Sequence, residues 1–192
     1  GLTQSGGANV LTITSGALAS NVATATISNP VLFGAGGTGE AVISVVDALA
    51  GTTNNLTLSG GFSAASLTKS GHGDLTISTV DPTISGGITI NGGEIKVDAT
   101  SRLGGATSIT VNGSSQAANR AGITFTHSVG TTQTLTTPIT VNAGTVSIST
   151  TNAATLQLNS NISGAGGVTY TNANASGIII IGGTNTYTGP TF

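Results

Sequence analysis

The charged residues closest together in this chain are Glu94, Lys96 and Asp98, which alternate with apolar residues in one short segment. Successive side chains of a β-strand point to opposite faces, so these three would share one face. Carboxylates clustered beside a Lys or Arg are what an enzyme needs to cleave an acidic polysaccharide, and carboxylates also bind calcium. A solvated row of charges explains the same spacing and contributes little to stability. We therefore expect no catalytic residues and no enzyme activity, and a polysaccharide-degrading enzyme is the least favoured alternative.

The histidines and the glycine-rich runs predict neither a metal site nor a cofactor site. His72 and His127 have no second ligand at a metal-ligand spacing, and the sequence contains no cysteine. Residues 71–74, Gly-His-Gly-Asp, are similar to one unit of a calcium-binding nonapeptide repeat but occur once. The glycine-rich run at residues 34–39 lacks the following Gly-Lys-Ser or Gly-Lys-Thr of a phosphate-binding loop. We expect no metal and no cofactor.

A recurring phrase indicates which elements position these residues. It reads Ile-Thr-Ile-Asn at residues 88–91 and Ile-Thr-Val-Asn at residues 109–112 and 139–142. In a strand, the two aliphatic side chains of each copy would point inward and the Thr outward. Recurrence at about twenty residues is typical of a solenoid, in which one supersecondary unit stacks along an axis. Stacking would place Ile on Ile and Val on Val in a narrow continuous core.

The Asn that ends each copy predicts a corner of the solenoid. A tight corner requires a left-handed backbone conformation, which Asn and Gly tolerate best. Asn side chains at successive corners can also hydrogen-bond into a ladder of stacked amides. We therefore predict that Asn91, Asn112 and Asn142 form a structural corner ladder and bind no ligand.

The whole chain of 192 residues is expected to be one domain, an all-β single-stranded parallel β-helix that is right-handed. One strand of each coil is predicted to start near residues 2, 24, 42, 67, 88, 109, 139, 168 and 190. This register gives about eight coils and a rod of roughly 40 Å. The two longest intervals predict loops that bulge from the rod, one at residues 113–121 and one at residues 149–155 or 171–176.

The phrases also resemble a known family. Leu67-Thr-Lys-Ser-Gly-His-Gly-Asp-Leu-Thr-Ile, with Ile-Ser-Gly-Gly-Ile-Thr-Ile-Asn-Gly-Gly-Glu-Ile after it, is similar to the autotransporter-associated β-strand repeat of bacterial passenger domains. Gly-Thr-Asn-Thr-Tyr-Thr-Gly-Pro-Thr at residues 183–191 resembles the second half of that repeat. The resemblance covers residues 67–97 well and the two ends in part. It implies a right-handed parallel β-helix that is displayed outside the cell on a bacterial surface.

Composition excludes two classes of partner. The chain contains four Lys or Arg and six Asp or Glu, which gives a net charge of −2. It therefore lacks the basic surface that binding to nucleic acids or anionic membranes requires. The longest aliphatic run, residues 178–181, is far shorter than the roughly 20 residues of a membrane-spanning helix. We expect neither nucleic-acid binding nor membrane insertion.

The preferred function is structural. Both ends of the sequence fall within a repeated phrase and show no polar cap, so we expect part of a longer chain or of a polymer. We predict an extracellular fibre or stalk whose copies stack head to tail, with a second copy as partner. The alternative is an adhesin that binds a surface glycan or protein through a loop containing Ser114, Ser115, Gln116, Asn119 and Arg120.

Overall fold

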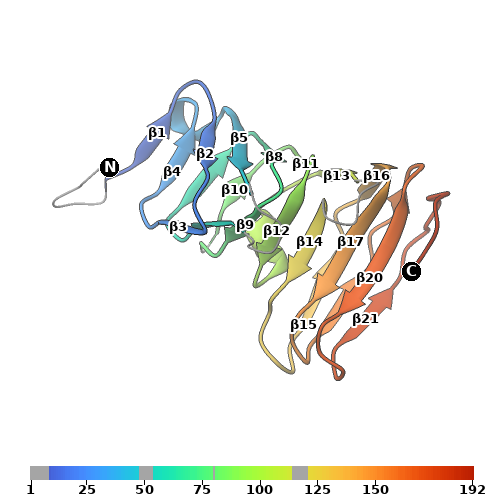
Figure 1. Cartoon of the computed structure of the whole chain (residues 1–192). Helices are drawn as coiled ribbons and strands as arrows, with labels where there is room; N and C mark the ends of the chain where they lie inside the picture. The colour runs from blue at the N-terminus through green and yellow to red at the C-terminus, as the bar shows by residue number, and fades with distance from the viewer. Residues whose placement is uncertain (1–8, 48–53, 80, 114–120) are drawn as a thin grey trace.

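The computed structural model describes residues 9–47, 54–79, 81–113 and 121–192. These residues form an all-β parallel solenoid of about seven turns, in which every strand pair is parallel and no α-helix occurs within the described ranges. Figure 1 shows the coils following one another along an elongated stack, from blue at the N-terminal side to red at the C-terminal side. No helix in the described part of the chain is long and apolar enough to cross a membrane.

Each coil contributes a segment to three faces. Face 1 consists of two separate sheets, formed by β1 (Leu11–Ile13), β4 (Val31–Phe33), β7 (Phe62–Ala64) and β10 (Thr83–Ile84), and by β15 (Thr132–Leu135), β18 (Thr155–Leu158) and β21 (Ile178–Ile181). Face 2 is one sheet of β2 (Leu18–Ser20), β5 (Glu40–Val45), β8 (Ser66–Ser70), β11 (Gly87–Ile90), β13 (Ser108–Asn112), β16 (Ile139–Ala143) and β19 (Ile162–Ser163). Face 3 is one sheet of β3 (Thr24–Ile27), β6 (Asn55–Leu58), β9 (Asp74–Ile77), β12 (Gly93–Val97), β14 (Ala121–Phe125), β17 (Thr145–Thr150) and β20 (Gly167–Asn172).

The predicted stacking of like on like is confirmed on face 2. Ile88 pairs with Ile109, Ile109 with Ile139, and Ile139 with Ile162, and all four side chains are buried. Burial of one such side chain contributes about 1.5–3 kcal/mol to the free energy of unfolding, so this column of four contributes substantially to stability. The solenoid has about seven turns, close to the eight expected, and β21 together with the bridge between Val168 and Thr191 begins a further one.

The register predicted for the two ends of the rod was wrong. Thr24 and Val168 lie on face 3, and the partner of Ile139 on face 2 is Ile162. The second long interval therefore disappears, and with it the predicted loop at residues 149–155, since Ser149 and Thr150 are buried within β17. The first predicted loop, residues 113–121, falls largely outside the described residues.

Face 1 is divided because a turn of 3₁₀ helix replaces a strand in one coil. This turn, η2 (Thr100–Leu103), follows β12, and its Leu103 is buried in the core where a strand residue would otherwise lie. The backbone N–H and Oγ1 of Thr100 donate to Oε1 of Gln133 in β15, at 3.0 and 3.2 Å. The Gln133 side chain thus links η2 to β15, where a backbone ladder would link two neighbouring strands.

Four face 1 strands, β4, β7, β10 and β15, were not predicted from the sequence. They contain only two to four residues and none carries the recurring phrase. The signal that could have identified two of them is a pair of aromatic residues. Phe33 ends β4 and Phe62 begins β7, and their rings meet edge to face with centroids 5.9 Å apart.

The left-handed conformation predicted for the corner Asn residues was also wrong. Asp81 is the one non-glycine residue with a positive φ among those described, and the left-handed position of the corner is taken by Gly93 and Gly144, at φ 65° and 63°. A Cβ atom at Gly93 would also overlap the carbonyl oxygen of Gly73 in the preceding coil. Glycine therefore supplies both the backbone torsion and the space for close coil stacking.

We expect Gly93→Ala to lower the free energy of unfolding by at least about 3 kcal/mol, because backbone strain and overlap add. Gly16→Ala is the matched control, since Gly16 has φ 92° and no described atom lies within 4 Å of its Cβ position. That variant should lose only the torsional cost of about 1–2 kcal/mol. Chemical denaturation monitored by circular dichroism measures both. Equal losses would contradict close packing at this corner.

Candidate functional site

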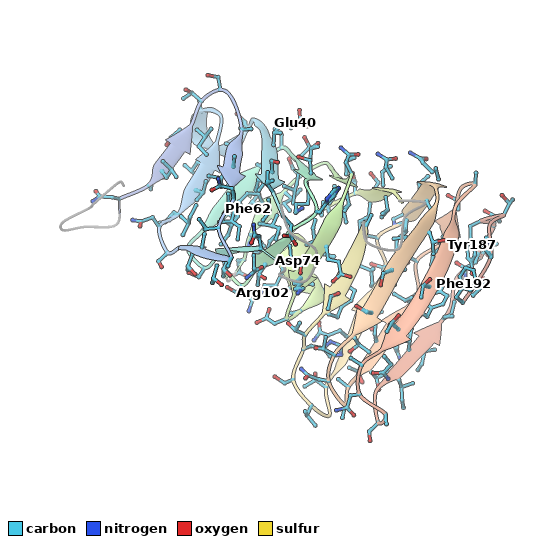
Figure 2. All side chains as sticks on the ribbon, viewed as in Figure 1. Glu40, Phe62, Asp74, Arg102, Tyr187 and Phe192 are labelled. Carbon is cyan, nitrogen blue, oxygen red and sulfur yellow. The ribbon has the colours of Figure 1, made fainter. Side chains whose placement is uncertain are left out.

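Several charged side chains lie on face 3, in β9 and β12, and just after β12. Figure 2 labels three charged residues, Glu40, Asp74 and Arg102, and shows Asp74 and Arg102 near the centre of the stack. Nζ of Lys96 on β12 lies 2.6 Å from Oδ2 of Asp74 on β9, and Asp74 is only 1% exposed. Removal of either partner would leave a charge without its counter-ion, which is costly for the buried Asp74.

Glu94 does not belong to a solvated row, contrary to the prediction. Its side chain is 3% exposed, and its Oε2 accepts a hydrogen bond of 2.8 Å from Oγ1 of Thr124. Since Thr124 donates its hydroxyl proton to Glu94, the 2.6 Å contact between Thr124 and Ser149 places Ser149 as donor to Thr124. The backbone N–H of Glu94 donates to Oδ1 of Asp74 at 3.2 Å. This polar network connects four coils of face 3.

The three residues with candidate chemistry are therefore not brought together. Glu94 bonds to Thr124, Lys96 pairs with Asp74, and Asp98 pairs with Arg102 through a 2.6 Å contact to Nε. Asp98 is exposed. Within the described ranges no group of three or more His, Cys, Asp or Glu could hold a metal ion.

Lys69 is a structural residue whose role was not predicted from the sequence. It occupies an inward position of β8, between Ile43 and Ile90 in the register, and is fully buried. Its Nζ donates to the carbonyl oxygens of Ser70, Gly71 and Gly92, at 2.8, 2.9 and 3.0 Å. These bonds tie together the corners of two successive coils. The burial of Lys69 could have been predicted from the alternation of side chains in the strand, because residues 67 and 69 must point to the same face.

Burial lowers the pKa of Lys69 to about 8, although Asp74 acts in the opposite direction. His127 is buried as well, and burial lowers its pKa, while Nε2 donates to the carbonyl oxygen of Thr155 at 3.2 Å. His72 is exposed. These two histidines lie on different coils and do not form a site.

The side chains of Asn91, Asn112 and Asn142 form a chain of hydrogen bonds along one side of face 2. Nδ2 of Asn112 donates to Oδ1 of Asn91 at 2.5 Å, and Nδ2 of Asn142 donates to Oδ1 of Asn112 at 2.8 Å. The amides continue from coil to coil although the coils differ in length. Between β13 and β16 the register holds from Ile109 to Val111 and then shifts by one residue, so that Asn112 aligns with Ala143, yet its amide still bonds to Asn142.

The two outermost strands of face 1 are open edges. In the described part of the chain, β1 pairs only with β4 and β21 only with β18. At the β21 edge Ile178, Ile180 and Ile181 are 53%, 43% and 47% exposed. All four Lys and Arg and all six Asp and Glu lie between residues 40 and 120, so the coils at both edges contain no charged side chain.

The predicted partner-binding loop lies outside the described residues. Its members are Ser114, Ser115, Gln116, Asn119 and Arg120. Binding of a glycan or protein by this loop stays a prediction from the sequence.

We expect Asn112→Ala to lower the free energy of unfolding by about 1–3 kcal/mol, because two amide hydrogen bonds are lost. Asn142→Ala removes one of these bonds and should cost about half as much. Urea denaturation of the two variants beside the unmodified protein measures the difference. Equal effects of the two substitutions would show that the chain of amides does not contribute to stability.

The pKa of Lys69 predicts a pH dependence of stability. The unfolded chain, with the ordinary value of 10.5, binds more protons than the folded chain above pH 8, so stability should rise with pH. We expect a rise of about 2 kcal/mol between about pH 7.5 and 9.5. Lys69→Met should abolish this rise.

Direct titration keeps this prediction testable if Lys69→Met does not fold. The chain contains two lysines, Lys69 and Lys96. Nuclear magnetic resonance of their labelled Cε atoms should show Lys69 titrating near pH 8. An ordinary pKa for Lys69, or stability that falls across the same pH range, would contradict the prediction.

Comparisons of the chain with models of protein families, with curated proteins and with solved structures give no match. The fold agrees with the β-helix that the autotransporter-associated repeat implies, but membership of that family does not follow from the fold. The conclusion that the geometry supports is architectural: the described residues form an all-β parallel solenoid of about seven turns, in which β1 and β21 each lack a partner on one side and the outermost coils contain no charged side chain.

Proposed function

We propose that this protein is a structural segment of an extracellular fibre or stalk on a bacterial surface, lengthened by end-to-end stacking of β-solenoid coils. One observation carries the proposal. The edges at β1 and β21 are unpaired within the described structure, and the coils that form them contain no Lys, Arg, Asp or Glu.

Open edges of this kind are unusual in proteins that remain monomeric. An edge strand is normally protected by charged side chains, by Pro or by a bulge, because its free N–H and C=O groups can pair with another chain. The strand β21 consists of four Ile residues and has none of these protections. Ile181 belongs to the inward column that contains the buried Leu158, yet it is 47% exposed. A further coil would cover it.

The surface location is supported by sequence resemblance and by composition. The phrases at residues 67–97 and 183–191 are similar to the autotransporter-associated repeat, which implies display outside the cell. Only four Lys or Arg occur in 192 residues, and Lys69 is fully buried, so few sites are open to trypsin-like proteases. Such resistance suits a protein that persists outside a cell.

An enzymatic role has less support from the geometry. The described carboxylates Asp74, Glu94 and Asp98 are each engaged by a different partner, and two of them are buried. A polysaccharide-cleaving site would need two carboxylates facing a shared bond of the substrate.

We expect the purified protein to form rods that lengthen with concentration, as measured by sedimentation velocity and negative-stain electron microscopy. Ile181→Lys should weaken assembly by about 100-fold or more, because it would place an unpaired charge in the joint. Val129→Lys is the matched control, since Val129 is 69% exposed in a turn away from both edges. Discrete monomers of the unmodified protein at every concentration would overturn the proposal.

A further inference from the structure

We infer that the occupant of the β21 edge is the β1 edge of a second copy, with the strands parallel, Leu11 beside Ile179 and Ile13 beside Ile181. This inference rests on the proposed function and specifies the contact between two copies, which we call the joint. It assigns the strand pair, the direction and the register through which one copy would extend another.

The position of the two strands in the coil supports this pairing. Both β1 and β21 lie on face 1, and each is the outermost strand of its sheet, at opposite ends of the stack (Figure 1). After β21 the chain continues against face 2, where the N–H of Thr186 donates to the carbonyl oxygen of Ile162. It then returns to face 3, where Thr191 bridges Val168. The next segment of a continuing solenoid would again lie on face 1, which is the place of β1.

The side chains fix the register. Ile179 and Ile181 extend the inward columns of Leu156 and Leu158, which are fully buried. Leu11 and Ile13 stand at the other end of equivalent columns, where they pair with Val31 and Phe33. A shift of one residue would turn Thr12 into the core and both apolar side chains outward. A shift of two residues would keep the alternation but leave one inward side chain of each strand without an apolar partner, so the stated register covers most apolar surface.

A second copy fits the edge better than an unrelated strand would. The edge to be covered is a whole three-sided coil, in which Tyr187 also packs against the core and remains partly exposed. An isolated extended peptide could pair with one face only. The coil of β1, β2 and β3 supplies three strands in the same order, and neither coil contains a charged side chain that would oppose contact.

Engineered cysteines test this register against a clean background, because the chain contains none. In the inferred joint Thr12 and Ile180 are outward neighbours on adjacent strands, roughly 5 Å apart, which suits a disulfide. Thr12→Cys/Ile180→Cys should therefore form covalent multimers on mild oxidation. The matched control is Thr12→Cys/Gln157→Cys, since Gln157 pairs with Ile180 one strand further from the edge. That pair would be roughly 10 Å apart and should cross-link about tenfold less.

The outcomes separate this inference from the proposed function. Covalent multimers from the first pair alone, on rods also seen without oxidation, would support both. Rods with no cross-link between positions 12 and 180 would overturn the register and leave the structural role standing. Equal cross-linking of both pairs would overturn the register too. Absence of rods for the unmodified protein would overturn the proposed function itself.

Discussion

The parallel register from coil to coil is the constraint on which the rest of this structure depends. Side chains alternate with a period of two, so each coil must return its strands in phase or lose its core. The spacing between face 2 partners is 21 residues from Ile88 to Ile109 and 30 from Ile109 to Ile139, yet both pairs are aligned. Length is free to vary at the corners, where no inward column is interrupted.

The sequence predicted those features that depend on this alternation. The Ile-Thr-Val-Asn phrase contains two inward positions, one outward position and a corner, and its three copies align three coils on face 2. Prediction failed where segments were too short to show a period, as in the two-residue strand β10. It failed at Thr24 and Val168 because faces 2 and 3 have the same alternation, which cannot distinguish one face from the other.

The individual residues were harder to predict because their surroundings come from other coils. Glu94 lies at an outward position, but it is buried and bonded to Thr124 thirty residues later. Lys69 lies at an inward position, where a charge is costly, and three carbonyl groups from two corners compensate. At the corners, the conformational preferences of Asn and Gly correctly predicted a turn. They assigned the left-handed backbone conformation to the wrong residue, since Gly93 adopts it and Asn91 does not.

The 3₁₀ turn η2 has a mechanical consequence. On either side of it three hydrogen-bonded ladders run along the axis, whereas at its level face 1 has no strand and only the ladders of faces 2 and 3 continue. A rod held by two ladders on adjacent sides resists bending unequally in different directions. The stiffness of this solenoid is therefore lowest at η2 for bending that opens or closes face 1, which gives the rod a built-in bending axis near its middle.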